Sequence, residues 1–188
     1  MRLIALLAVS SSMLIALPGA GMIPLAGEKE SRLAIGIPLP VLEGSYLTGK
    51  KARLPEASQG KIALLALGFT YESRHEVEKW SERFAGEFAK TPDFTFYEIP
   101  LIGGIGRIAR WFIDSGMRRG TPKERHENVI TVYGSVDPWK QRVGYDKPDD
   151  AYLILIDRQG TIRWLHAGPF DEPAFAQLSD IVRSLGNE

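Results

Sequence analysis

A short apolar run at residues 62–69, which reads Ile-Ala-Leu-Leu-Ala-Leu-Gly-Phe, constrains the fold of this chain more than any other feature. An unbroken run of this length is typical of a β-strand that is buried on both faces. A helix is predicted to follow from about Ser73, because apolar side chains then recur at helical spacing. These side chains are Val77, Trp80, Phe84 and Phe88. A buried strand that leads into an amphipathic helix predicts an α/β protein.

The first turn of this helix carries a capping pattern. Ser73 and Glu76 match the S-x-x-E capping box. In that motif the hydroxyl and the carboxylate each accept a hydrogen bond from a backbone N–H that has no partner in the helix. The sequence therefore predicts that both side chains cap the helix.

The remaining elements follow from the same periodicities and from turn residues. Residues 28–60 are predicted to be irregular, because Pro38, Pro40 and Pro55 exclude a long helix. After the first helix we expect a strand at 94–101, a helix opened by glycines at 103–119, a strand at 129–133, a short helix from Asp137, a strand hairpin at 151–157 and 161–166, and a last helix from Glu172 to about Gly186. This order predicts a mixed central sheet with helices on both faces.

The predicted order of elements is that of thioredoxin, and local motifs support the match. The segment after the buried strand resembles membrane-associated thioredoxin-like reductases, in which W-x-x-W-C-x-x-C follows the strand. Glu72 and His75 stand at the two cysteine positions, and the chain contains no cysteine. The place of the superfamily's cis-proline falls near Ala151. The resemblance therefore implies an α/β, thioredoxin-like fold that performs no thiol chemistry.

A narrower family shares further short motifs with this chain over roughly residues 39–185. They are Leu39-Pro40 to Glu43-Gly44, Arg125-His126-Glu127-Asn128 before Tyr133-Gly134, and the hairpin Tyr152-Leu153-Ile154-Leu155-Ile156-Asp157 through Ile162-Arg163-Trp164. On these motifs the chain resembles a bacterial relative of the mitochondrial F-type ATP synthase assembly factor ten family. Members of that family are peripheral to the inner mitochondrial membrane and help to install a membrane subunit of the proton channel. The resemblance implies a protein partner, with a membrane-complex subunit as the candidate.

The first 27 residues have the pattern of an export signal. One basic residue, Arg2, precedes an almost wholly apolar stretch at 3–17, which Pro18-Gly19-Ala20-Gly21 interrupts. This is the build of a secretory signal peptide, but the uncharged stretch is also long enough for a membrane anchor. We therefore expect residues 1–27 to be a signal peptide or an anchor, and residues 28–188 to form one thioredoxin-like domain. The expected location is the periplasm or the outer face of the inner membrane.

Two groups of residues are candidates for interaction. The first is the corner that replaces the thiol motif, which consists of Tyr71, Glu72, Arg74 and His75. Its alternative interpretation is a capped helix start with solvated side chains. The second group is a basic surface with the interleaved aromatics Trp111 and Phe112. Its members are Arg107, Arg110, Arg118, Arg119, Lys123 and Arg125. Such a segment suits an anionic membrane surface or an acidic partner, and the alternative is a core-packing helix with a charged outer face.

The sequence gives no support for a catalytic, metal or cofactor site. His75, His126 and His166 are widely separated and lack the close spacing of metal ligands. A Gly104-x-Gly106-x-x-Ala109 pattern matches a dinucleotide fingerprint, but such a match alone is weak. With 23 basic and 23 acidic residues, no nucleic-acid partner is expected. We therefore predict a non-redox binding protein, such as an assembly factor or chaperone. The alternatives are an exported enzyme that uses Glu72 and His75, and a small-ligand carrier.

Overall fold

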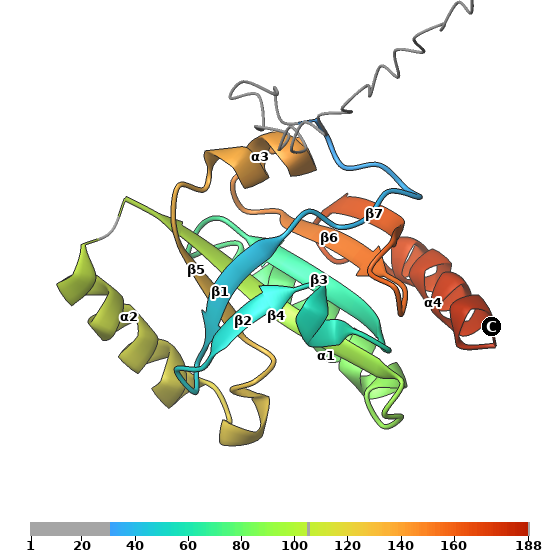
Figure 1. Ribbon diagram of the computed structural model, residues 1–188, viewed down its shortest axis with the longest axis horizontal. Coiled ribbons are helices and arrows are strands. Elements are labelled where there is room, and N and C mark those ends of the chain that lie inside the picture. Colours follow the sequence, from blue (N-terminus) through green and yellow to red (C-terminus); the bar gives the residue numbers. More distant parts are fainter. Residues whose placement is uncertain (1–30, 105, 188) are drawn as a thin grey trace, which may run out of the picture.

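The computed structural model describes residues 31–104 and 106–187 (Figure 1). The predicted signal or anchor at 1–27 lies outside the described residues. The elements in chain order are β1 (Leu42–Tyr46), β2 (Lys51–Leu54), the 3-10 turn η1 (Glu56–Ser58), β3 (Ile62–Gly68), α1 (Arg74–Phe88), β4 (Phe94–Gly103), α2 (Arg107–Gly120), the 3-10 turn η2 (Lys123–Arg125), β5 (Ile130–Gly134), α3 (Asp137–Val143), β6 (Ala151–Ile156), β7 (Ile162–Gly168) and α4 (Glu172–Gly186).

Seven strands of the described chain form one sheet in the order β2-β1-β5-β4-β3-β6-β7. The β3, β4 and β5 strands run parallel, whereas β6 pairs antiparallel with β3 and β1 pairs antiparallel with β5. One core lies between the sheet and the helices α1 and α4, and α3 and residues 33–39 pack on the opposite face (Figure 1). The predicted mixed sheet with helices on both faces is therefore confirmed.

The β3 strand is apolar throughout because it supplies both cores. Ile62, Leu64 and Ala66 belong to the core under α1 and α4, and the alternate residues Ala63, Leu65 and Leu67 belong to the core on the other face. Successive side chains of a strand point to opposite faces, so a central strand covered on both sides has no polar position.

Within the described residues 31–60 the structure differs from the predicted irregular segment, because β1 and β2 form a hairpin at one edge of the sheet. The prolines at 38, 40 and 55 lie outside these strands and so leave the ladder intact. Gly49 provides the positive φ of the hairpin turn, at +89°. Gly44 lets β1 approach β5, because a Cβ there would lie 2.5 Å from the Ile130 side chain.

The predicted capping box at α1 is wrong. Ser73 already has helical backbone angles and makes no side-chain cap. Its buried hydroxyl donates a hydrogen bond to the Thr70 carbonyl at 2.9 Å. The Glu76 carboxylate instead accepts from Phe170 N at 2.7 Å and from Lys79 Nζ at 2.7 Å. Glu76 therefore joins the start of α1 to the loop before α4.

The helix α2 starts later than predicted, since β4 extends to Gly103 and Gly104 then turns the chain at a φ of +67°. Figure 1 shows α2 at the outside of the molecule, beside the part of the sheet formed by β5 and β1. None of its described side chains is buried. The alternative interpretation of this segment as a core-packing helix is therefore wrong. No helix within the described ranges is both long enough and apolar enough to cross a membrane.

Candidate functional site

The corner between β3 and α1 is built by a small hydrogen-bond network around Thr70. The Thr70 hydroxyl donates toward the Pro148 carbonyl at 3.2 Å and the Asp149 carboxylate at 3.0 Å, and it accepts from Ser73 N at 3.0 Å. Gly68 makes room for this arrangement, because a Cβ there would meet Ser73 Oγ at 2.7 Å. The network fixes the start of α1 against the loop that precedes β6.

Tyr152 on β6 holds the other side of this corner. Its hydroxyl accepts from the backbone N–H groups of Asp146 and Lys147 at 2.9 and 3.1 Å and donates to the Lys147 carbonyl at 2.9 Å. The ring packs edge-on against Phe69, with 5.5 Å between centroids. Buried aromatic packing therefore positions the 146–149 loop, and that loop in turn positions Thr70.

The four predicted corner residues, Tyr71, Glu72, Arg74 and His75, are all exposed. The Arg74 guanidinium lies 4.1 Å from the centroid of the Tyr71 ring, which is a cation–π contact. The Glu72 carboxylate and His75 Nε2 are 3.9 Å apart, with side chains that are 65% and 52% exposed. A pair this open and this far apart is neither a tight hydrogen bond nor a desolvated acid–base pair. The corner thus presents a polar surface at the thiol position.

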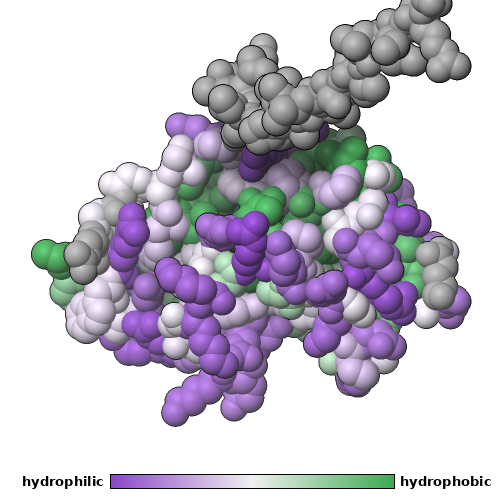
Figure 2. All heavy atoms as spheres, in the orientation of Figure 1, coloured by the Kyte–Doolittle hydropathy of each residue, from purple (hydrophilic) through white to green (hydrophobic). Residues whose placement is uncertain are grey.

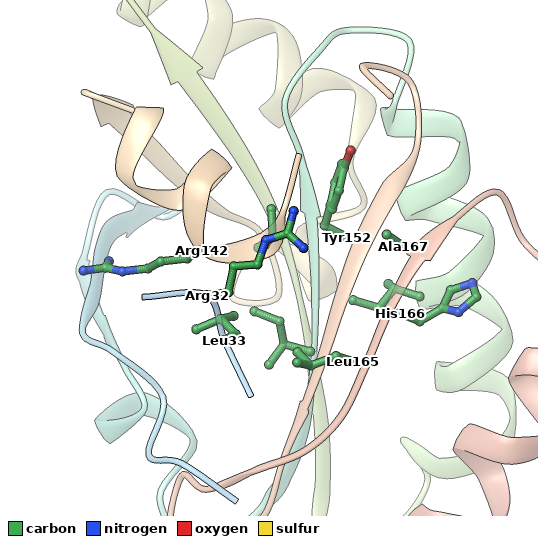
Figure 3. A pocket seen from close by; sticks show the side chains of 10 residues that line it. Arg32, Leu33, Arg142, Tyr152, Leu165, His166 and Ala167 are labelled. Atoms are coloured by element: carbon green, nitrogen blue, oxygen red, sulfur yellow. The ribbon is translucent and has the colours of Figure 1, made fainter. Parts of the chain in front are cut away.

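A cavity of roughly 230 Å³ lies between the 31–33 segment, the end of α3 and the β6–β7 hairpin (Figure 3). Arg32, Leu33, Tyr152 and Leu165 line it. His166 is also part of its wall, but its side chain points away from the cavity toward α1 (Figure 3). The cavity is small and partly aliphatic, and none of the described residues in its wall carries a carboxylate.

The three histidines lie in separate environments. His166 stacks on Trp164 with 5.4 Å between ring centroids, and burial lowers the pKa of its imidazole. The ring of His126 is 3.0 Å from the Thr121 carbonyl, after α2. Across residues 31–104 and 106–187, no group of three His, Asp or Glu side chains is placed to hold a metal.

The Arg125-His126-Glu127-Asn128 motif has a structural role, because it joins β4 to the β1–β2 turn. Arg125 binds Glu98 on β4 at 2.6 Å, Glu127 binds Lys50 of the β1–β2 turn at 2.7 Å, and Asn128 donates to the Phe96 carbonyl at 2.9 Å. Arg125 was predicted as part of a basic surface, and the structure places it half-buried between Glu98 and Glu82. Burial raises the pKa of Glu98 to about 7, although the Arg125 charge opposes this shift.

The inner face of α2 holds the helix against the sheet. The Tyr133 hydroxyl donates to Asp114 at 2.6 Å, and the Arg110 guanidinium lies 5.0 Å from the Tyr133 ring centroid. Burial and the Asp114 carboxylate raise the pKa of Tyr133. Arg118 donates to the Leu47 carbonyl at 3.4 Å. Among the predicted basic residues, Arg119 and Lys123 are exposed, and the side chain of Arg107 lies outside the described part of the structure.

The outer face of α2 carries large apolar side chains in water. Ile108, Trp111 and Phe112 are 78%, 61% and 62% exposed, and the Trp111 and Phe112 rings pack edge-on with 4.9 Å between centroids. Figure 2 shows hydrophobic residues at this end of α2, at the left margin of the molecule. Ile108 and Phe112 are four residues apart, so helical spacing alone puts them on one face of α2. The spacing could not show that this face points away from the core.

The sheet order and the helix positions define a thioredoxin-like domain whose usual redox corner contains no thiol. Within that class, the chain belongs to the ATP10 protein family, whose model matches residues 32–185. This result agrees with the resemblance to the ATP synthase assembly factor ten family. No curated protein matched the sequence.

Solved structures support the same fold. The thioredoxin domain of a thiol-disulfide oxidoreductase from Bacteroides vulgatus is similar with a TM-score of 0.52 and 18% identity, and the match covers 80% of this chain and 99% of that one. BsSco, a member of the Sco family of cytochrome c oxidase assembly proteins, is similar with a TM-score of 0.54 and 13% identity. That match covers 85% of this chain and 100% of BsSco. At these identities the likeness establishes the fold alone.

Proposed function

We propose that this protein is a non-redox binding protein that assists the assembly of a membrane complex of the ATP synthase type. Membership of the ATP10 protein family supports this role. The absence of cysteine removes the nucleophile with which thioredoxin-like enzymes act. BsSco provides a parallel, because it shares the fold and its own family is one of cytochrome c oxidase assembly proteins.

The observation that carries the proposal is the outer face of α2. Monomeric proteins seldom leave several large apolar side chains together in water, and such patches mark sites of interaction. Here three of them, Ile108, Trp111 and Phe112, fall within five residues on one helix. The proposed place of action is the outer face of the inner membrane, or the periplasm beside it, which agrees with the export pattern of residues 1–27.

Deletion of the protein from its native cells tests the assembly role. We expect less fully assembled ATP synthase on native gels, with normal amounts of the messenger for each subunit, and recovery when the full chain is supplied again. The variant Ile108→Ser with Phe112→Ser should fail to restore assembly, although both side chains are exposed and the fold should remain intact. Normal assembly in the deletion strain would contradict the proposal.

The same strain separates binding from catalysis at the corner. We expect the double variant Glu72→Ala with His75→Ala to restore assembly fully, because both side chains are exposed and 3.9 Å apart. Failure of this variant, in a protein of unchanged stability, would favour an enzyme that uses these two groups in place of thiols.

A further inference from the structure

The two faces of α2 differ in a way that indicates what covers the outer one. Residues 108, 111 and 112 lie on one side of the helix, at the i, i+3 and i+4 positions, and Arg119 extends the same side by two turns. Asp114 is the one acidic residue of α2, and it is held on the opposite side by the Tyr133 hydroxyl. Among the described side chains of α2, the outer face therefore combines three apolar side chains with Arg119 and has no carboxylate.

Exposed cations lie at the C-terminal end of α2 and in the turn that follows it. Arg119 is exposed, and the following turn η2 exposes both Lys123 and the acidic Glu124. The Arg119 guanidinium donates to Ser115 Oγ, a neutral partner, at 3.0 Å. Aromatic and aliphatic side chains beside Arg and Lys are the composition of a helix that lies in the plane of an anionic membrane surface.

The shape of the patch also favours a lipid surface. Ile108, Trp111 and Phe112 project from the outside of a helix whose described side chains are nowhere buried. Projecting side chains need a groove of matching shape in a protein partner, whereas the headgroup region of a bilayer is fluid and adapts to them. The position of α2 at the margin of the molecule leaves this face accessible (Figures 1 and 2).

We propose that the outer face of α2, formed by Ile108, Trp111, Phe112 and Arg119, docks on an anionic lipid bilayer with the help of Lys123 in the adjacent turn η2. Trp111 and Phe112 enter the headgroup region, and the two cations contact lipid phosphates. This inference rests on the proposed function, which uses the same face, and it names an anionic bilayer as what that face contacts.

Tryptophan fluorescence provides a local test. Trp111 is 61% exposed, whereas the other three tryptophans of the chain, Trp80, Trp139 and Trp164, are buried. The difference between the spectra of the full-length wild type and Trp111→Phe therefore reports on position 111. With vesicles of phosphatidylcholine and phosphatidylglycerol in equal parts, we expect a blue shift of this signal, and its loss when brominated lipids are used. Membrane contact by another part of the chain does not reproduce a signal at position 111.

Two variants test which side chains are responsible. Ile108→Ser with Phe112→Ser should weaken the vesicle affinity reported by Trp111 by about a hundredfold, because two apolar side chains no longer leave water. Arg119→Glu with Lys123→Glu should remove the dependence on phosphatidylglycerol. The matched control, Lys61→Glu with Lys90→Glu, reverses two exposed charges elsewhere and should bind as the wild type does.

Three results would overturn the proposal. The first is a Trp111 signal that does not change with anionic vesicles. The second is an equal response to pure phosphatidylcholine, which would exclude the anionic headgroup. The third is a blue shift of the Trp111 signal with a purified membrane-complex subunit in detergent but not with vesicles. That result would assign this face to a protein partner and leave the proposed assembly role intact.

Discussion

Replacement of Glu98 by Gln should change how the stability of the protein depends on pH. Glu98 is 14% exposed on β4, and it binds Arg125 at 2.6 Å. Burial raises the pKa of this carboxyl from 4.5 to about 7, the Arg125 charge lowers it, and the charges of Glu78 and Glu82 raise it. The folded protein therefore holds this proton more tightly than the unfolded chain does.

The size and the sign of the effect follow from these two pKa values. Each pKa unit corresponds to 1.36 kcal/mol, so a rise from 4.5 to about 7 corresponds to about 3 kcal/mol in the free energy of unfolding. This contribution is complete below pH 4.5 and is lost as the pH rises through about 7. A neutral Gln has no such dependence. The wild type should therefore lose about 3 kcal/mol relative to Glu98→Gln between a pH below 4.5 and a pH well above 7.

Urea denaturation of both proteins across this pH range measures the difference directly. Glu127→Gln is a matched control, because this carboxylate belongs to the same segment as Arg125 but is 58% exposed in its pair with Lys50. Its difference from the wild type should stay nearly constant, since exposed ion pairs contribute little. Parallel curves for the wild type and Glu98→Gln, or a difference of the opposite sign, would refute the argument that burial dominates at Glu98.

Four further substitutions test the packing and the corner. Phe84→Ala should lower the free energy of unfolding by about 3 to 5 kcal/mol, because this side chain is fully buried. Phe112→Ala should change it by less than about 0.5 kcal/mol, because this side chain is exposed. Chemical denaturation compares the two variants, and equal losses of stability would mean that Phe112 packs inward. Gly68→Ala should cost about 1 to 3 kcal/mol, since its Cβ would meet Ser73 Oγ at 2.7 Å, and a thermal shift near zero would contradict this. Thr70→Val should cost about 1 to 2 kcal/mol and speed hydrogen exchange at Ser73 N; unchanged exchange would show that the hydroxyl does not hold the corner.

The central part of the fold could be predicted because its constraints are local. The apolar run at 62–69 has to be covered on both faces of the sheet. The buried residues of β6 alternate between the two cores, and a tight turn joins β6 to β7. The α4 helix also followed from sequence, since Asp171 caps it through Ala174 N and its apolar stripe is buried. In these segments the pattern of apolar and capping side chains favours the same strand or helix that the chain adopts in the fold.

The parts that could not be predicted depend on distant partners. The β1 and β2 strands are short and form a sheet edge, and β1 joins the rest of the sheet only through β5. Glu76 matched a capping pattern, but the backbone N–H that it binds lies 94 residues away. Helical spacing puts Ile108 and Phe112 on one face of α2, but the direction of that face depends on the hydrogen bond between Tyr133 and Asp114 on the other side of the helix. Arg125 was likewise predicted to be a surface charge, because the sequence does not show that Glu98 on β4 lies beside it.

Crosslinking of the full-length protein in its native membrane, followed by mass spectrometry, tests the proposed assembly role most directly. A photoreactive residue at position 115, between the apolar and cationic parts of the outer face of α2, would sample this surface. We expect lipid adducts together with membrane subunits of the F-type ATP synthase, and loss of both in the Ile108→Ser, Phe112→Ser variant. Capture of unrelated envelope proteins, with no enrichment of ATP synthase subunits, would contradict the proposed function and leave only the thioredoxin-like fold.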